Sequence, residues 1–281
     1  MRKWIVRGLI GLAGLVVLVL AVVYGGSQMV IAKSHAVPET ALTIPSDAAS
    51  IAEGGRLARV MGCRNCHESE GQGSVLVDDP MLGRLAPPAF ARVAANYSDA
   101  DLARAIRYGV HKDGSSLWVM PTKSYNAIAD DDLARIIAWI RTLKPSDKDS
   151  LATTRFGPLG RALVLAGAFP PSVQTGNHSV ATRPAEVGGY FVKTICAGCH
   201  LMHGTQPSDD GKQTVPGLLD VAPAYDQAAF RKLLKTGRGM SNRDLGMMRD
   251  VAEKDFSYMS EAEVDAILAW VKAEQAKAPA K

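Results

Sequence analysis

Two short motifs in the chain combine a pair of cysteines with an adjacent histidine: residues 63–67 (CRNCH) and 196–200 (CAGCH). All four cysteines of the chain lie in these motifs: Cys63, Cys66, Cys196 and Cys199. Two thiols three residues apart on a helical turn can form thioethers with the two vinyl groups at one edge of a haem, and the next residue turns its imidazole toward the iron. We therefore expect two covalently bound haem c groups, with His67 and His200 as iron ligands.

Other uses of paired cysteines fit this pattern less well. A zinc ribbon places its two cysteine pairs about 15–20 residues apart, whereas these motifs begin 133 residues apart and each carries its own histidine. A thioredoxin-like redox pair needs a strand and a helix around it, and neither motif follows an alternating strand pattern. Plain disulfides are a further alternative in an oxidising compartment.

The second axial ligand is expected to be a methionine in each half, because methionine raises the haem potential and suits electron transfer. Met120 lies 53 residues after the first histidine, just before the last helix expected in that half. Four methionines of the second half lie within range of its haem: Met240, Met247, Met248 and Met259. Aligning residues 107–109 (RYG) with 235–237 (KTG) carries Met120 onto Met248. We predict Met120 and Met248, with Met247 as the alternative.

Groups around each haem follow from the chemistry of metal-bound histidine, which usually donates its second ring N–H to a carbonyl or carboxylate. The carbonyls of Pro80 and Pro216, in the loops after the two motifs, are the candidates for this role. Arg107 and Tyr125 are expected to meet haem propionates.

The elements that must position these residues repeat along the chain. Residues 133–139 (LARIIAW) recur as 264–270 (VDAILAW), at an offset of 131. In each half, helical periodicity predicts a helix before the motif, a middle helix and a final amphipathic helix. These helices are expected at 48–62, at 99–108 and from 130 in the first half, and at 186–195, at 226–235 and from 260 in the second.

A close crossing of the first and last helices is expected in each half. Gly54 or Gly55 should face Trp139, and Gly188 should face Trp270. A glycine opposite an aromatic ring lets two helices approach closely.

The N-terminal segment has the pattern of a membrane anchor. An apolar run covers residues 8–23, and after residues 25–28 (GGSQ) it continues over 29–32. The whole stretch 8–32 has 25 residues, and a spanning helix needs roughly 20. Arg2, Lys3 and Arg7 precede the apolar run, which places the N-terminus in the cytoplasm and the rest of the chain outside. The alternative is a cleaved signal peptide, for which residues 34–36 (SHA) are a suitable site.

The fold class expected from these patterns is all-α, with an N-terminal transmembrane helix and two tandem haem domains. The expected parts are 1–33 (cytoplasmic start and anchor), 34–44 (linker), 45–145 (first domain), 146–183 (ordered interdomain linker) and 184–277 (second domain). The apolar stretch 159–169 of the long linker is too short to span a bilayer. We expect it to pack on a protein surface, with contact with the membrane as the alternative.

Charge is not concentrated on a folded part of the chain. The net charge is +4. Basic and acidic residues number twelve and twelve in 45–145 and eleven and thirteen in 184–277, so the basic excess lies in the tails and the linker. A nucleic-acid-binding domain would carry a basic face, and this class of function is not expected.

The first half resembles a known family. Residues 105–110 (AIRYGV), Asp113-Gly114, Met120-Pro121 and Tyr125 precede the final helix in the order found in multihaem class I cytochromes c. The pattern is similar to the membrane-bound cytochrome c subunits of bacterial alcohol and gluconate dehydrogenases. Those subunits commonly carry three haem domains, whereas this chain has two motifs, so the resemblance implies the haem architecture and His/Met ligation but not the substrate.

The expected function is single-electron transfer by a membrane-anchored, two-haem cytochrome c on the periplasmic side of the inner membrane. Its donor would be a membrane or periplasmic dehydrogenase or a quinol-oxidising complex, and its acceptor a cytochrome or an oxidase. Two alternatives stay open: a diheme peroxidase-like enzyme with one open haem site, and an assembly subunit that relays electrons inside a respiratory complex. No catalytic residue is predicted.

Overall fold

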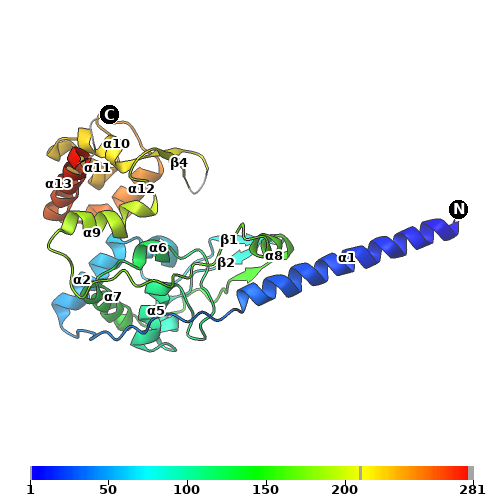
Figure 1. Cartoon of the computed structure of the whole chain (residues 1–281). Helices are drawn as coiled ribbons and strands as arrows, with labels where there is room; N and C mark the ends of the chain where they lie inside the picture. The colour runs from blue at the N-terminus through cyan, green and yellow to red at the C-terminus, as the bar shows by residue number, and fades with distance from the viewer. Residues whose placement is uncertain (1, 209–210, 278–281) are drawn as a thin grey trace.

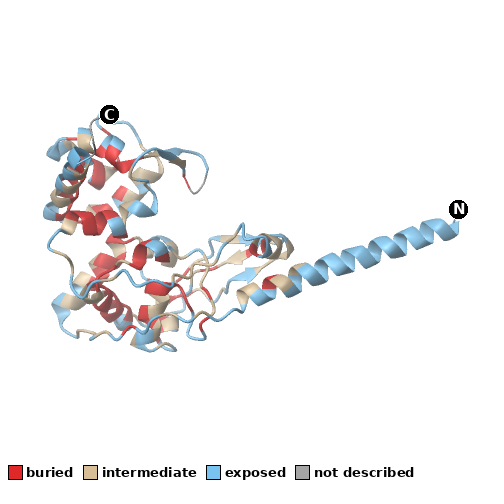
Figure 2. Ribbon diagram, viewed as in Figure 1, coloured by how far each residue is buried: buried red, intermediate tan, exposed pale blue. Residues whose placement is uncertain are grey.

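The computed structural model describes residues 2–208 and 211–277. One long helix projects from a body in which two helical halves pack against each other (Figure 1). The residues of the first half, 45–145, lie beside the base of the long helix, and those of the second half, 184–277, lie farther from it. Figure 2 shows buried residues gathered within each half and a long helix that is exposed over most of its length.

The long helix, α1, runs from Arg2–Ile31 and is long and apolar enough to cross a membrane. None of its most apolar window is buried against the protein. Its 30 residues correspond to about 45 Å at a rise of about 1.5 Å per residue. The apolar N-terminal helix predicted from the sequence is thus present.

The first half contains the three predicted helices and several short ones. Its elements are α2 (Ala48–Val60), α3 (Cys63–His67), β1 (Val77–Asp79), β2 (Gly83–Leu85), α4 (Phe90–Ala94), α5 (Asp99–Tyr108), α6 (Thr122–Tyr125) and α7 (Asp130–Thr142). Ser98 and Asp101 form a capping box at the start of α5, and Gly109 ends that helix in the left-handed conformation. The predicted bounds of α5 are therefore confirmed.

The second half repeats this plan after the linker. Its elements are α9 (Val187–Thr194), η1 (Cys196–Gly198), β4 (Thr205–Pro207), β5 (Thr214–Pro216), α10 (Leu218–Val221), η2 (Ala222–Ala224), α11 (Gln227–Thr236), α12 (Met247–Lys254), η3 (Phe256–Tyr258) and α13 (Glu261–Lys277). Ser260 and Glu263 exchange the two hydrogen bonds of a capping box before α13, as predicted. Gly237 ends α11 in the left-handed conformation, like Gly109 in the first half.

The core of each half forms where its first and last helices cross. A Cβ added to Gly54 would lie 1.8 Å from the carbonyl oxygen of Arg135 on α7, and one added to Gly188 would lie 2.1 Å from that of Ala266 on α13. The tryptophans also lie at these crossings, since a Cβ on Gly55 would be 2.9 Å from Trp139. The predicted close crossings are confirmed in both halves.

Two small antiparallel sheets accompany the helices, although the sequence predicted an all-α chain. Strands β1 and β2 pair with β3 (Arg155–Phe156) from the linker, and β4 pairs with β5. Each strand has only two or three residues, which is too short for an alternating pattern to be visible in the sequence. The chain is accordingly mostly helical rather than wholly helical.

The linker follows the surface of the first half, as expected for an ordered segment. It carries β3 and one helix, α8 (Pro158–Leu165). Trp118 from the first half lies against Phe156 and Phe169 of the linker, with ring centroids 5.0 and 5.6 Å away. The expectation that residues 159–169 pack on a protein surface is confirmed for Val164, which is buried.

Candidate haem-attachment sites

The first cysteine motif forms a short helical turn at the end of α2. Gly62 precedes it in the left-handed conformation, which turns the chain sharply before Cys63. Helix α3 then holds Cys63 and Cys66 one turn apart, with His67 as its last residue. Cys63 and Cys66 are half-buried, and burial raises the pKa of the Cys63 thiol to about 12. The motif therefore has the conformation that thioether attachment at one haem edge requires.

The imidazole of His67 is oriented by a backbone carbonyl. Its Nδ1 lies 2.8 Å from the carbonyl oxygen of Pro88. The ring stacks on Phe90, with centroids 4.2 Å apart. Burial lowers the pKa of His67, which favours the neutral imidazole that ligates metals. These contacts hold Nδ1 as the donor to the carbonyl and leave Nε2 for the iron.

The second motif has the same arrangement in a tighter turn. Helix η1 begins at Cys196, and burial raises the pKa of that thiol to about 12. The Nδ1 of His200 lies 2.9 Å from the carbonyl oxygen of Pro216, which confirms the prediction for this half. In the first half the prediction of Pro80 was wrong, because the loop there is longer and the carbonyl is supplied by Pro88, 21 residues after the histidine. The proline pair 87–88 just before α4 was the signal that could have identified it.

The alternatives for the cysteines find no support in the part of the chain that the structure describes. Within residues 2–208 and 211–277, no group of three His, Cys, Asp or Glu side chains could hold a metal ion. No disulfide joins the cysteines of these residues. Neither motif is preceded by a strand, since α2 and α9 lead into them.

The predicted sixth ligands both lie at the edge of the core. Met120 and Met248 are partly buried and pack against the core cluster. Met240 is 61% exposed and Met259 is 5% exposed within the core, so neither has the half-buried setting of Met120. Met247 begins α12 and is also half-buried. Methionine ligation by Met120 and Met248 stays a prediction.

Arg107 and Tyr125 occupy different settings. The Arg107 side chain is 1% exposed, its Nη2 donates to the carbonyl oxygen of Ile128 at 2.8 Å, and it pairs with Asp130. Its Nε has no partner among the described residues, as is also true of the buried hydroxyl of Tyr108. Tyr125 instead donates its hydroxyl to the carbonyl oxygen of Met61 at 2.8 Å.

These settings test whether a haem fits the first half. A buried guanidinium N–H and a buried hydroxyl without partners are costly unless a further acceptor is present, and a haem propionate is such an acceptor. The half-buried cysteines Cys63 and Cys66, the oriented histidine and these two donors together fit a haem. The hydroxyl proton of Tyr125 is already donated to the carbonyl oxygen of Met61, so the structure gives no support for a propionate contact by this residue. That contact stays a prediction.

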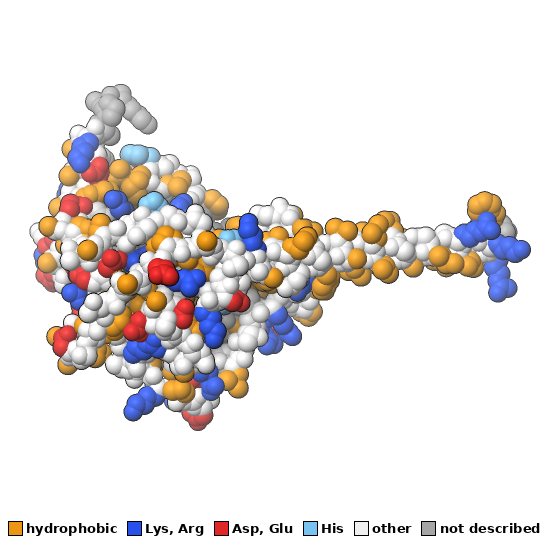
Figure 3. All heavy atoms as spheres, turned by 60° about the horizontal axis from the view of Figure 1, so that its bottom comes forward, with side chains coloured by type: hydrophobic (Ala, Val, Ile, Leu, Met, Phe, Trp, Pro, Cys, Tyr) orange, Lys and Arg blue, Asp and Glu red, His pale blue; other side chains and the backbone are white. Residues whose placement is uncertain are grey.

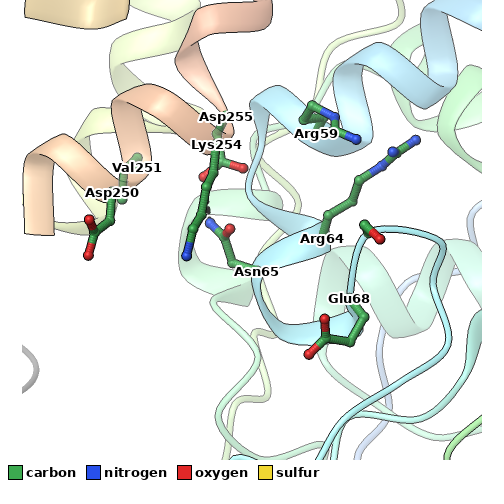
Figure 4. A pocket seen from close by; sticks show the side chains of 9 residues that line it. Arg59, Arg64, Asn65, Glu68, Asp250, Val251, Lys254 and Asp255 are labelled. Carbon is green, nitrogen blue, oxygen red and sulfur yellow. Dashed lines mark hydrogen bonds between the residues drawn. The ribbon is translucent and has the colours of Figure 1, made fainter. Parts of the chain in front are cut away.

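The first attachment turn faces the second half across a cleft. Asn65, between the two cysteines, donates a hydrogen bond to Asp255. The cleft has a volume of about 530 Å³, and its lining residues come from both halves (Figure 4): Arg59, Arg64, Asn65, Glu68, Ser69, Asp250, Val251, Lys254 and Asp255. Burial raises the pKa of Asp255 to about 6. The guanidinium of Arg59 also lies 4.3 Å from the ring centroid of Tyr258.

The second attachment turn faces the first half in the reciprocal way. Helix η1 contacts α6, the helix that follows Met120 in the chain. A Cβ on Gly198 would lie 3.4 Å from the hydroxyl of Ser124 on α6. Each cysteine motif thus lies against the part of the other half that follows a predicted methionine ligand.

An ion-pair network joins the two halves and the linker, and no sequence pattern indicates it. Arg183 of the linker binds the fully buried Asp132 of α7, at 2.8 Å from Nε. It also reaches Glu53 of α2 at 3.0 Å and Glu263 of α13 at 3.5 Å. The hydroxyl of Tyr190, on α9, donates to Asp132 at 2.8 Å. The partners lie up to 210 residues apart in sequence, and no short-range pattern connects them.

Comparison with known proteins agrees with this geometry. Residues 51–144, which contain the first motif, match the family model named Cytochrome c. The part of the chain that carries the first motif thus belongs to the cytochrome c family. The match ends before the second motif, so in the second half the assignment depends on the repeated helices and the attachment turn.

Three relatives are cytochrome subunits of dehydrogenases. The fructose dehydrogenase cytochrome subunit of Gluconobacter japonicus is 27% identical over 261 residues, covering 82% of this cytochrome and 53% of the relative. The gluconate 2-dehydrogenase cytochrome c subunit of Pantoea cypripedii is 24% identical over 266 residues (82% and 60%). The alcohol dehydrogenase (quinone) cytochrome c subunit of Gluconacetobacter polyoxogenes is 24% identical over 273 residues (83% and 57%). The cytochrome spans about half to three fifths of the length of these relatives.

Proposed function

We propose that this protein is a membrane-anchored cytochrome c with two haems that passes single electrons. The observation that carries the proposal is the paired attachment turn, in which each histidine is held by a proline carbonyl at 2.8 and 2.9 Å. That contact orients the opposite ring nitrogen for a metal. It occurs twice, after equivalent helices of a repeated plan.

The residues of each half have defined tasks in this proposal. A bound haem c supplies reversible one-electron chemistry at its iron. Cys63 and Cys66 would bind one haem and Cys196 and Cys199 the other, with His67 and His200 as proximal ligands. Met120 and Met248 would close the second face of each haem, exclude water and raise its potential. The protein holds and insulates the haems and needs no acid–base group for this task.

The same proposal assigns the parts of the chain. Residues 45–145 and 184–277 would be two cytochrome c domains, 146–183 the linker between them and 34–44 the connection to the anchor. Helix α1 would remain in the inner membrane as a single span, with both domains on the periplasmic side. The three basic residues before the apolar run support this orientation.

The partners belong to the proposal as well. The relatives are subunits of fructose, gluconate and alcohol dehydrogenases. We infer that the donor is a membrane or periplasmic dehydrogenase or quinol-oxidising complex, and the acceptor a cytochrome or oxidase. Purification in mild detergent tests this: co-purifying dehydrogenase or oxidase subunits support it, and a lone monomer argues against a stable complex.

The ligands are tested by potentiometric titration of the haem spectra in wild type, Met120→Ala and Met248→Ala. Each substitution should convert one low-spin haem to high-spin and lower its potential, because the soft thioether is lost from the iron. Met247→Ala is the matched control, since its side chain lies next to Met248 and should leave both haems unchanged.

The opposite results have defined meanings. A second haem that changes in Met247→Ala but not in Met248→Ala would move the ligand by one residue. A haem already high-spin in the wild type would instead support the peroxidase-like alternative, which needs an open iron. The double variant Cys196→Ser, Cys199→Ser should lose the second haem and keep the first.

A further inference from the structure

The linker helix α8 packs against the end of α1 that leaves the proposed membrane span (Figure 1). Arg161 of α8 donates to the hydroxyl of Ser27 at 3.1 Å and to the side-chain oxygen of Gln28 at 3.2 Å. Its guanidinium carbon lies 4.9 Å from the ring centroid of Tyr24. A Cβ on Gly26 would lie 2.8 Å from the side chain of Leu165. Helix α8 is therefore fixed to the last two turns of α1.

The position of these turns relative to a bilayer follows from the sequence of α1. Trp4 and Tyr24 are separated by 20 residues, which corresponds to about 30 Å of helix. This equals the typical thickness of the hydrocarbon core, and tryptophan and tyrosine favour its two boundaries. With Arg2 and Lys3 on the inner side, Tyr24 lies at the outer boundary. Helix α8, which touches Tyr24, then lies at the level of the outer lipid headgroups.

The first half is held rigidly at this position by further contacts. The hydroxyl of Ser34 donates to the carbonyl oxygen of Asp113 at 3.2 Å, and the backbone N–H of His35 donates to that of Gly114 at 2.9 Å. On the other side, α8 lies directly on the β1–β2 turn, because a Cβ on Gly160 would be 2.1 Å from the carbonyl oxygen of Leu82. The direction of α1 is thus fixed relative to the first half at two places.

The surface beside α1 is apolar where it would meet lipid. Four large apolar side chains on α8 and the β1–β2 turn are exposed: Met81 (55%), Leu82 (42%), Leu159 (45%) and Leu165 (38%). The opposite face of α8 is buried and contains Gly160 and Val164. Figure 3 shows hydrophobic side chains from α1 onto the adjoining body, with basic side chains beside them.

Charge on this surface also suits a lipid bilayer. Residues 151–185 contain no aspartate or glutamate, but they contain Arg155 and Arg161. On the neighbouring strand Asp78 is paired with Arg84 at 2.7 Å and with Arg155 at 3.5 Å. The other acidic group of this strand, Asp79, accepts hydrogen bonds from the backbone N–H groups of Met81 and Leu82 at 2.8 Å. Arg84, Arg155 and Arg161 outnumber these two carboxylates, so the balance of charge favours contact with lipid phosphates.

We propose that α8 and the β1–β2 turn rest on the outer lipid leaflet, with Leu159, Leu165, Met81 and Leu82 among the acyl-chain ends. The occupant of this surface is lipid and not a second protein, because the surface is continuous with the proposed span and lies at the depth of the headgroups. The contact keeps the first haem-attachment turn at one height and orientation above the membrane. This proposal rests on the proposed retention of α1 in the membrane.

The depth of α8 can be measured because all native cysteines belong to the attachment motifs. A cysteine introduced as Leu165→Cys would be the single reactive thiol of the holoprotein and can carry a nitroxide. Val221→Cys on α10 is the matched control, because Val221 is 37% exposed against 38% for Leu165 but lies in the second half. The full-length cytochrome is reconstituted in phosphatidylcholine–phosphatidylglycerol vesicles, and collisions with oxygen and with a water-soluble nickel chelate are measured by electron paramagnetic resonance.

The nitroxide at Leu165 should collide with oxygen several-fold more often, relative to nickel, than the nitroxide at Val221 does. Equal ratios at the two sites would overturn the proposal. Protection of the Leu165 label from both collision partners would also overturn it, because protein and not lipid would then cover the helix.

Failure of the anchor is distinguished by two independent measurements. Intact mass and alkaline extraction of the same vesicles show whether α1 is present and embedded. If α1 is embedded and the Leu165 label is in water, only the lipid contact of α8 is wrong. If the protein is extracted by alkali, the anchor itself is wrong, whereas unchanged haem spectra would leave the electron-transfer proposal in place.

Discussion

At the scale of single residues, the orientation of each proximal histidine depends on one backbone carbonyl. Pro88 and Pro216 accept from Nδ1 at 2.8 and 2.9 Å. A proline carbonyl is a suitable acceptor because the ring restricts the backbone and the carbonyl cannot rotate freely. The histidine tautomer is thereby set by the fold before any metal is bound.

Asp255 is the residue whose titration should be measurable in the stability of the protein. Its pKa is raised from 3.8 to about 6 by burial, so the folded state holds a proton that the unfolded state releases. The contribution of Asp255 to the free energy of unfolding is fully favourable below pH 3.8 and is lost as the pH rises through 6. Above pH 6 the folded protein contains a buried ionised carboxylate.

We expect Asp255→Asn to be more stable than wild type at pH 8, because asparagine cannot ionise and can still bond to Asn65. Two pKa units at about 1.4 kcal/mol each set an upper limit of about 3 kcal/mol. The gain should vanish near pH 4, as measured by urea unfolding followed by circular dichroism. Asp265→Asn is the control with opposite sign, since the ion pair with Arg231 lowers the pKa of that carboxylate. A variant less stable at pH 8 than at pH 4, relative to wild type, would contradict the prediction.

At the scale of elements, each half is organised by one helix crossing. Helices α2 and α7 meet at Gly54, and α9 and α13 meet at Gly188. The backbones are too close there for any side chain. The attachment motif follows directly after the first helix of each pair, so the crossing sets the position of the cysteines.

Gly54→Ala should therefore destabilise the first half strongly. The added methyl would lie 1.8 Å from a backbone oxygen, and the helices would have to separate. Overpacking of a core costs about 1–3 kcal/mol and occasionally more, and we expect about 3 kcal/mol here. Urea unfolding and haem retention measure the effect. Gly239→Ala is the control, because its methyl would make an ordinary contact at 3.5 Å and the residue lies outside both attachment motifs. Equal stability of the two variants would show that the helices are not so close.

At the scale of the whole molecule, Arg183 connects the linker with both halves. Its partners lie on α2, α7 and α13, and the carboxylate of Asp132 beneath it is fully buried. Breaking a buried pair by removing one partner is strongly destabilising, because it leaves an uncompensated charge. Arg183 thus sets how the two attachment turns face each other.

Arg183→Met should lower the free energy of unfolding by about 3 kcal/mol, the low end of the usual range of about 3–5 kcal/mol. The loss is limited because Arg135 still lies 2.8 Å from Asp132 and Tyr190 still donates to it. Lys235→Met is the control, since its pair with Glu261 is exposed and should contribute less than about 1 kcal/mol. Equal effects of the two substitutions in urea unfolding would exclude the network as a structural link.

The chemistry and the local elements of this protein can be recognised in its amino-acid sequence. The spacing of cysteines and histidine, the helical periods, the glycine stops of α5 and α11 and the apolar run of α1 are all short-range patterns. They depend on residues a few positions apart, so their physical meaning can be recognised without a fold. The closeness of Gly54 to α7 was also predictable, because the repeat showed which helices correspond.

Contacts between groups that are distant in sequence become visible only in the folded protein. The carbonyl of Pro88 was missed because the loop of the first half is longer, with 21 residues from the histidine to the proline against 16 in the second half. Three sets of contacts join segments that are far apart in sequence, in some cases by more than 200 residues. They are the ion pairs of Arg183, the reciprocal contacts of the attachment turns and the packing of α8 on α1. Such contacts arise from the packing of whole elements, where burial and charge balance act between residues that have no sequence relation.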